Sequence, residues 1–373
     1  MILNDICEVY SGYALKKFNE NGDGLPVIKI GNILADGTLQ LEDCEYTIEK
    51  VHDKYYSKKE DIYVALSGAT TGKIGINKSD KKYIINQRVG IVRKKDNNIP
   101  NEFIKFFLLR QTERILQEAA GCAQPNISPK QIAQYALPDI RSEKMRQIVV
   151  VLNRLTSVIV SRKTELQKLD DLIKARFVEM FGDEKNLKPM SELCLIITDG
   201  THQPPKFQDT GIPFIFVSNI TGDKVTYDTE KFIDQNTYDE LIKRTPIEIG
   251  DVLLSTVGSY GHPAVVKSDK KFLFQRHIAY LKPRREIIDS DYLHGAILSP
   301  DAQRQIEEGV KGIAQKTLNL SEIKKMRIPI PNMNEQKEFA AFVDQVDKSK
   351  VVVQKALDEV QVLFDSLMQQ YFG

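Results

Sequence analysis

The chain has almost no net charge, no long apolar run and no cysteine motif, and each absence excludes a class of protein. Its 52 basic and 51 acidic residues leave a formal net charge of +1, so any surface that attracts nucleic acid has to be local. No apolar run reaches the length of a membrane span, and residues 1–5 lack the pattern of a signal peptide. We therefore expect a cytoplasmic protein with no membrane partner.

The four cysteines show no paired metal-ligand spacing. Cys7 and Cys194 hold equivalent places in the internal repeat described below, each inside an apolar run. Cys44 and Cys122 complete the set. Buried free thiols are a better interpretation of these positions than disulfides or metal ligands.

Signatures of catalysis are also missing. The loop at 68–73 differs from a phosphate-binding loop, because its glycines are one residue too close and Ile74 stands where Ser or Thr would bind magnesium. Asp301 and Glu322 have the loose spacing of a nuclease metal site, but a helix capping box already explains Glu322. The histidines lack metal-ligand spacing. The sequence therefore predicts a binding protein without a catalytic site or a metal site.

Two long amphipathic stretches are present instead, at 148–182 and 339–373. Their apolar residues advance by threes and fours and keep phase at a fixed offset of 191 residues, which is typical of long helices that pack on each other. About 34 residues at 1.5 Å each would make a rod roughly 50 Å long. The predicted contact stripe comprises Leu152, Leu155, Ile159, Leu166, Leu169, Ile173, Val343, Val346, Val353, Leu357, Val360 and Phe364.

The rest of the chain is duplicated as well. Residues 78–82 return letter for letter as 267–271, Gln87-Arg88 returns as Gln275-Arg276, and the capping box at 128–131 returns at 319–322. We predict a globular domain at 1–141, a helix at 142–182, a second globular domain at 183–331 and a second helix at 332–373. The predicted fold class is α/β (α+β), with short strands and a helix at 102–119 in the first domain.

The duplication predicts that the two helices are antiparallel, because the second must return to the first domain. Matching their midpoints pairs Arg162 with Asp358 and Lys350 with Asp170. Further apolar residues are expected on the outer faces of the helices, where they would bind helices of a partner. These are Val149, Val151, Phe177, Ala340, Phe342 and Val352.

Two related domains on a rigid spacer suit an extended, roughly twofold target, and duplex DNA is such a target. The matched lysine clusters of the repeats are basic, although a solvated hairpin turn explains them equally well. The polar loops differ more between the copies than the strands do, as expected of two modules that recognise different bases.

Over its whole length the chain resembles the specificity subunit of type I restriction–modification systems. The resemblance lies in the duplication, the two long helices, Gly-Ala-Thr-Thr-Gly-Lys at 68–73, Ala-Gln-Pro-Asn-Ile-Ser at 123–128 and Asp-Gly-Thr-His at 199–202. It implies two tandem target-recognition domains joined by antiparallel coiled-coil helices in a pseudo-twofold circular arrangement.

The resemblance also implies a non-catalytic DNA-binding subunit for a bipartite site in double-stranded DNA. Its partners would be two adenine-specific methyltransferase subunits and, in the full complex, two restriction subunits. S-adenosylmethionine, ATP and magnesium would be bound by those partners and not by this chain. The alternative function is a coiled-coil scaffold that displays two protein- or glycan-binding domains.

Candidate DNA-binding residues come from the polar loops of each repeat. For Arg88 and Arg276 an equally good alternative is an ion pair with a core carboxylate. The candidates in the first domain are Thr70, Thr71, Lys73, Lys78, Arg88, Gln124 and Asn126, and those in the second are Thr201, His202, Lys206, Ser259, Tyr260, Arg276, Gln315 and Lys316.

Overall fold

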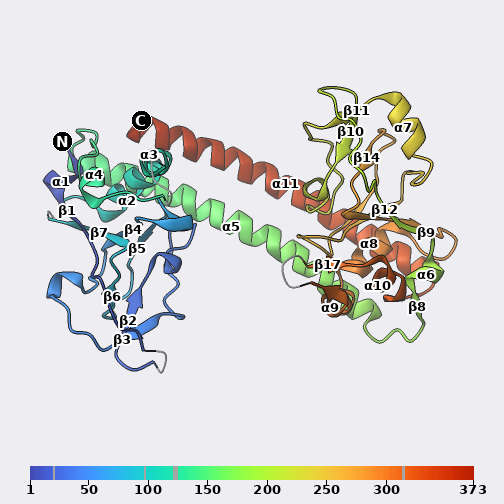
Figure 1. Cartoon of the computed structure of the whole chain (residues 1–373), viewed down its shortest axis with the longest axis horizontal. Helices are drawn as coiled ribbons and strands as arrows, with labels where there is room; N and C mark the ends of the chain where they lie inside the picture. Colours follow the sequence, from blue (N-terminus) through green and yellow to red (C-terminus); the bar gives the residue numbers. More distant parts are fainter. Residues whose placement is uncertain (20–21, 96–97, 121–124, 313–315) are drawn as a thin grey trace. The chain divides into compact units, whose positions relative to one another are not determined.

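The computed structural model describes residues 1–373 except 20–21, 96–97, 121–124 and 313–315. Its contacts divide the chain into two compact units (Figure 1). Unit 1 comprises Met1–Ser161 and Ala356–Gly373, and unit 2 comprises Arg162–Lys355. Both ends of the chain therefore belong to unit 1, as the duplication predicts.

The main sheet of unit 1 is antiparallel, with the strand order β1-β7-β4-β5, and a smaller sheet has the order β3-β2-β6. The strands are β1 (Cys7–Ser11), β2 (Leu25–Ile28), β3 (Glu45–Thr47), β4 (Ile62–Ala65), β5 (Ile74–Ile76), β6 (Ile84–Ile85) and β7 (Val89–Lys94). The helices are α1 (Leu3–Ile6), α2 (Asn101–Arg110), α3 (Thr112–Ala119) and α4 (Pro129–Ala133), with 3-10 turns η1 (Ile30–Asn32), η2 (Asp53–Tyr55) and η3 (Gly68–Thr70).

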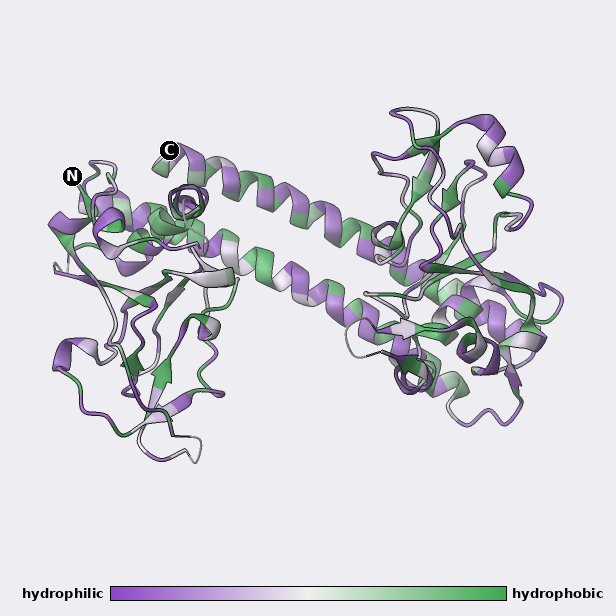
Figure 2. Ribbon diagram, in the orientation of Figure 1, coloured by the Kyte–Doolittle hydropathy of each residue, from purple (hydrophilic) through white to green (hydrophobic). Residues whose placement is uncertain are grey.

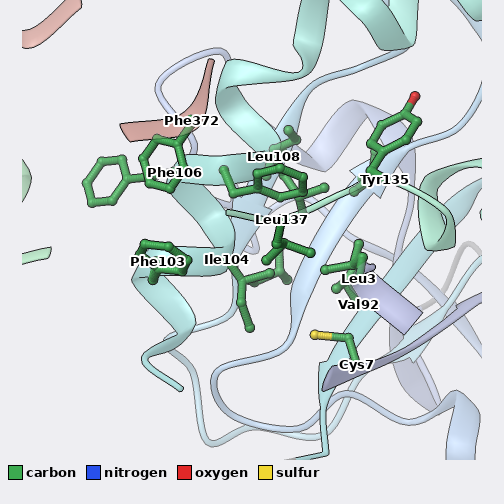
Figure 3. Packing of buried hydrophobic residues seen from close by; sticks show 14 of the residues in the cluster. Leu3, Cys7, Val92, Phe103, Ile104, Phe106, Leu108, Tyr135, Leu137 and Phe372 are labelled. Carbon is green, nitrogen blue, oxygen red and sulfur yellow. The ribbon is translucent and has the colours of Figure 1, made fainter. Parts of the chain in front are cut away.

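Strand β4 is buried on both faces, which explains why its sequence is apolar without a break. Successive side chains of a strand point to opposite faces. Ile62 and Val64 belong to the core beneath the helices, whereas Tyr63 and Ala65 belong to a second core. Figure 3 shows the core beneath the helices. In it, Phe103 of α2 lies beside Phe372, and their ring centroids are 5.1 Å apart. This core therefore joins the sheet to the end of the chain.

Unit 2 repeats this architecture. Its main sheet has the order β13-β12-β15-β9, and β10 pairs in parallel with β14 as β2 does with β6. The strands are β8 (Leu187–Pro189), β9 (Cys194–Asp199), β10 (Ile212–Ile215), β11 (Phe232–Ile233), β12 (Val252–Ser255), β13 (Pro263–Val265), β14 (Leu273–Phe274), β15 (Ile278–Pro283), β16 (Val310–Lys311), β17 (Thr317–Leu318) and β18 (Arg327–Pro329). The helices are α6 (Met190–Leu193), α7 (Gln235–Leu241), α8 (Ser290–Leu298), α9 (Pro300–Gly309) and α10 (Leu320–Lys325), with a 3-10 turn η4 (Val217–Asn219).

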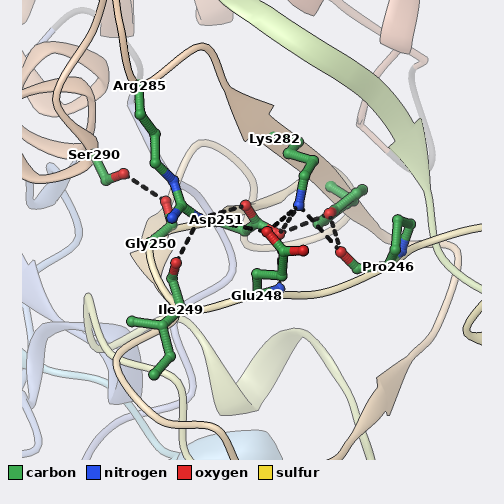
Figure 4. Close-up of polar contacts among 9 residues, drawn as sticks. Pro246, Glu248, Ile249, Gly250, Asp251, Lys282, Arg285 and Ser290 are labelled. Atoms are coloured by element: carbon green, nitrogen blue, oxygen red, sulfur yellow. Dashed lines mark hydrogen bonds and ion pairs between the residues drawn. The ribbon is translucent and has the colours of Figure 1, made fainter.

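A buried carboxylate precedes the central strand in each unit. In unit 1 Asp61 accepts two hydrogen bonds from Arg93, at 2.7 and 2.6 Å. In unit 2 Asp251 accepts a hydrogen bond from the Tyr280 hydroxyl at 2.7 Å. Its carboxylate also lies 3.4 Å from both Lys282 and Arg285 (Figure 4). The duplication thus kept the acid and changed its partners.

Two predicted local features are wrong. The helix predicted at 102–119 is broken at Gln111, whose amide closes the end of α2 on the carbonyls of Phe107 and Leu108 before α3 begins. The capping box forms at Ser128 and Gln131 but not in the second copy. There Asn319 makes no side-chain cap, and Glu322 pairs with Lys325 at 3.2 Å instead.

The long helices are α5 (Ser142–Phe181) and α11 (Met333–Phe372), each of 40 residues. Within unit 2 they are antiparallel. Asp170 of α5 pairs with Lys350 of α11 at 2.6 Å. About two turns later on α5, the ring of Phe177 lies 5.3 Å from that of Phe339, which comes earlier on α11. The predicted Asp170–Lys350 pair is therefore confirmed.

The other predicted ion pair, Arg162 with Asp358, would join residues of different units. Arg162 pairs at 2.6 Å with Glu165 of its own helix. Asp358 belongs to unit 1 and Arg162 to unit 2, so their pairing stays a prediction.

Every residue of the predicted contact stripe is buried or half-buried. The outer face differs from the prediction. Val149 and Phe177 are buried in the cores of units 1 and 2, because these cores reach further around each helix than the stripe does. Val151 and Val352 are 41% and 69% exposed, and Ala340 and Phe342 are half-buried. Figure 2 shows apolar and polar segments interleaved along both helices.

Candidate nucleic-acid interface

One end of the main sheet of unit 1 brings three polar segments together. Strands β1 and β4 end there and β7 begins there. Ser67, which follows β4, forms an antiparallel backbone bridge with Asn126. The Gly68 amide donates to the Pro125 carbonyl at 3.1 Å. A cavity of about 510 Å³ opens between these segments and the turn before β7. Its polar lining comprises Ser11, Ser67, Gln87, Arg88, Asn126 and Ser128.

Arg88 and Asn126 are the two predicted DNA-binding residues that meet at this cavity. Both are exposed. Among the residues that the structure describes, Arg88 makes no ion pair, whereas the core carboxylate Asp61 is paired with Arg93. The alternative role for Arg88, as the partner of a core acid, is therefore wrong, and its guanidinium is available to a ligand.

The neighbouring loop is shaped by its own hydrogen bonds. Thr71 is buried, and its hydroxyl donates to the Gly68 carbonyl at 2.7 Å. Gly72 has φ +83°, and a Cβ there would contact Ile115 of α3 at 3.4 Å, so this turn packs closely on the helix. Lys73 is half-buried. Its carbonyl accepts from the Ala65 amide at 2.9 Å.

Thr70 has a different environment from Thr71. Its side-chain oxygen is buried and has no hydrogen-bond partner in the described part of the chain. Thr71 thus has a structural task that accounts for its hydroxyl, whereas Thr70 does not.

Lys78 lies at the opposite end of the sheet. It follows β5 beside the start of β4, where the Asn77 amide donates to the Asp61 carbonyl at 2.8 Å. Other lysines of the two clusters have local partners: Lys82 lies over the Tyr56 ring at 3.7 Å, and Lys267 pairs with Asp291. The lysine clusters are therefore not part of the cavity edge that holds Arg88.

Unit 2 has an equivalent edge, but its register differs by one residue from the sequence match. The Gln87 amide donates to the Tyr13 carbonyl at 2.9 Å, and the Arg276 amide donates to the Thr201 carbonyl at 3.1 Å. Arg276 is thus equivalent to Gln87, and His277 to Arg88. The prediction that Arg88 and Arg276 are equivalent positions of the two copies is therefore wrong. The strand that follows each turn fixes the register, and the residue types in the turn do not.

His277 and Arg244 are two residues that the sequence analysis missed. The Arg276 Nε lies 3.4 Å from the His277 ring, and partial burial together with that positive charge lowers the pKa of His277. Arg244 pairs with Asp199, whose other oxygen lies 2.8 Å from His202. Neither residue lies in a shared motif, and only the equivalence of His277 to Arg88 could have identified one of them.

Two of the remaining candidates of unit 2, Tyr260 and Lys316, contact each other. The Tyr260 hydroxyl donates to Glu307 at 2.9 Å, and Lys316 lies over the Tyr260 ring at 5.9 Å. Ser259 and Lys206 are exposed, and Thr201 is half-buried. Gln124 and Gln315 lie outside the described residues.

No group of three or more His, Cys, Asp or Glu side chains within the described ranges is arranged to hold a metal ion. In the same ranges no helix is long and apolar enough to cross a bilayer. Cys7, Cys44 and Cys194 are buried free thiols, as predicted.

Comparisons with known proteins agree on one family. The model of the type I restriction modification DNA specificity domain matches residues 1–170 and 188–361. The chain is 23% identical over 413 aligned positions to the type I restriction enzyme EcoBI specificity subunit of Escherichia coli, covering 99% of this chain and 84% of that protein.

Two solved structures share the fold. The S subunit of a type I restriction-modification system from M. genitalium aligns with a TM-score of 0.51 and 16% identity, over 100% of this chain and 95% of that chain. A chain from a study of complex assembly and conformational transition in a type I system aligns with a TM-score of 0.56 and 16% identity, over 100% and 96% of the two chains.

Proposed function

Because the chain belongs to the type I restriction modification DNA specificity family, we propose that each unit recognises one half of a bipartite DNA site. The duplicated sheet edge is the observation that carries this proposal. The same hydrogen bonds hold the turn before β7 in unit 1 and before β15 in unit 2, yet the turn residues are Gln87 and Arg88 in one and Arg276 and His277 in the other. A shared scaffold with different donors suits two different base sequences.

The chemistry of these side chains fits base edges in the major groove. Arginine donates two hydrogen bonds to guanine, and asparagine or glutamine pairs with adenine. In unit 1 Gln87, Arg88 and Asn126 lie around one cavity, so they can contact neighbouring bases together. In unit 2 Arg276 and His277 supply the corresponding donors, and Lys316 and Arg244 would contact phosphates.

We assign no reaction to this chain. Methylation would be carried out by two methyltransferase subunits bound along the long helices, and cleavage by two restriction subunits. S-adenosylmethionine, ATP and magnesium would be held by those partners. The comparisons do not support the scaffold alternative, since the matching family is described as a DNA specificity domain and the Escherichia coli relative is named a specificity subunit.

The test uses the complex of the full chain with its methyltransferase subunits. Methylation sequencing of the host genome first gives the two half-sites. Binding is then measured by fluorescence anisotropy for DNA altered in one half or the other. Arg88→Ala should cost about 1–3 kcal/mol and relax specificity in one half-site only, and Arg276→Ala should do so in the other.

Lys78→Ala is the matched control, since it removes the same charge at the far end of the same sheet. It should leave base preference unchanged. Equal loss of discrimination in both half-sites for Arg88→Ala and Arg276→Ala would refute the assignment of one unit to one half-site.

A further inference from the structure

A second cavity lies in unit 2 between α8, α11, the end of β13 and the segment that follows η4. Its volume is about 350 Å³, at the lower end of the range for small-molecule sites, which is about 300–1,000 Å³. A neighbouring hollow of about 330 Å³ shares Asp223, His294, Val343 and Asp347 with it. The two hollows therefore adjoin around these side chains.

Two polar groups in this cavity lack protein partners. His294 of α8 is only 9% exposed, and its Nε2 atom has no hydrogen-bond partner in the described part of the chain. Within the same residues Asp223 makes no ion pair and no side-chain hydrogen bond. A buried polar atom without a partner is costly, by about 1–3 kcal/mol, so a ligand that donates hydrogen bonds would remove that cost.

More acidic than basic side chains line the cavity. Asp223, Asp291, Asp344 and Asp347 line it, against Lys224 and Lys267. Lys267 is already paired with Asp291, and Lys348 is already paired with Asp344 at 2.7 Å. Asp347 is paired with Lys350 at 3.6 Å, so Asp223 is the one lining acid that makes no ion pair with the described residues.

The other walls are apolar. Val225, Tyr227, Val265 and Val343 line the same space. Burial lowers the pKa of His294, an effect that the acids Asp223, Asp347 and Asp291 only partly oppose. The ring is therefore neutral near pH 7, and its Nε2 can accept a hydrogen bond.

We propose that this cavity binds an organic cation, a guanidinium group on a short hydrocarbon chain, which ion-pairs with Asp223 and donates to His294 Nε2 while its chain lies against the valines. A guanidinium has five donors in a plane and is weakly hydrated, so it suits scattered acceptors in an apolar cavity better than an ammonium does. The group could belong to a free small molecule or to an arginine side chain of a partner protein.

The local backbone offers a clean variant. Asp223 has φ +58°, a left-handed conformation that Asn and Asp tolerate better than other side chains. Asp223→Asn therefore removes the charge and preserves the turn. Asp183→Asn is the matched control, because Asp183 is exposed just after α5 and outside the cavity. Ala340→Leu fills the cavity from α11 without changing any charge.

Binding is measured by isothermal titration calorimetry on the full chain, with agmatine as the free cation and Nα-acetyl-arginine amide as the side-chain probe, at constant ionic strength. We expect saturable binding at one site per chain. Asp223→Asn and Ala340→Leu should each raise the Kd at least tenfold, and Asp183→Asn should leave it unchanged. Circular dichroism shows whether each variant is folded.

The two probes separate the two sources. Binding of agmatine alone supports a free small molecule, and binding of the capped arginine supports a partner side chain. The proposal is overturned if neither probe binds saturably to the wild-type chain. It is also overturned if folded Asp223→Asn binds as tightly as wild type, since the interaction would then be general charge attraction.

Discussion

Individual residues show which polar groups hold the fold and which are left for a ligand. Asp61 is 2% exposed and is held by the Arg93 guanidinium, and the hydrogen bonds and charge of Asp61 raise the pKa of Arg93 despite its burial. Arg88 is exposed and has no acidic partner in the described residues. Arg93 therefore stabilises the fold, whereas Arg88, five positions earlier, is left for a ligand.

Asp61→Asn should destabilise unit 1 by about 3–5 kcal/mol, because it leaves the Arg93 charge buried and unpaired. The measurement is urea unfolding of the full chain followed by circular dichroism. Asp80→Asn is the matched control, since the side chains of Asp80 and Lys59, which form an ion pair, are 77% and 54% exposed and exposed pairs contribute little to stability. Equal losses for the two variants would contradict the structural role of Asp61.

Cys7 and Cys194 should be unreactive in the native chain. Burial raises the pKa of each thiol to about 12, although nearby basic residues oppose it, and the thiolate is the reactive form. Because the raised pKa favours the protonated thiol, the buried thiol contributes fully to the stability of the fold below its unfolded pKa near 9. That contribution is lost as the pH rises through the folded pKa of about 12.

At pH 8 the reaction of these thiols with a disulfide reagent should be at least about a hundredfold slower in buffer than in urea. Cys7→Ser and Cys194→Ser assign the two reactions. A native rate close to the unfolded rate for either thiol would show that it is not buried.

At the scale of elements, each long helix presents a buried stripe to a core and a second apolar surface to solvent. Val343 and Val346 are buried, whereas Val351 and Val352 are 55% and 69% exposed on the same helix. These two valines lie outside the hydrophobic cores of the residues that the structure describes. They are the surface on which we expect a methyltransferase helix to pack.

Val352→Glu should weaken binding of the methyltransferase subunit at least tenfold and leave urea unfolding within about 0.5 kcal/mol of wild type. Surface plasmon resonance measures the affinity. Gln369→Glu adds the same charge where a polar side chain already faces solvent and should have little effect. If Val352→Glu binds like wild type, this part of α11 is not the docking surface.

At the scale of the whole molecule, the helices are proposed to set the distance between the two half-sites. Leu169 packs on the core of unit 2, so an insertion just after it would disturb that core. The boundaries between the units fall after Ser161 on α5 and after Lys355 on α11. Added residues belong there.

One heptad inserted at each of these two boundaries should lengthen the unread gap by about 3 base pairs. Seven residues keep the apolar stripe in phase and add about 10 Å, and duplex DNA rises about 3.4 Å per base pair. Methylation sequencing gives the new sites, whose half-site sequences should be unchanged. Full activity at the original spacing would show that the helices do not set the distance.

The sequence alone determined the features that depend on local order. The apolar spacing of 148–182 and 339–373 gave two helices of 40 residues each, and the repeated motifs gave two units with the same sheet order. The antiparallel pairing of Asp170 with Lys350 followed from the duplication as well. These features were predictable because periodicity and repetition are properties of neighbouring residues in the chain.

The tertiary structure decided which distant residues meet. Strand pairing makes Arg276 of unit 2 the structural equivalent of Gln87 in unit 1, one residue away from the match between the two sequences. Packing brought Arg244 to Asp199 across 45 residues, and it left Asp223 and His294 facing one cavity. No pattern in the sequence records such contacts, because they depend on strand register and on the volume that side chains leave unfilled.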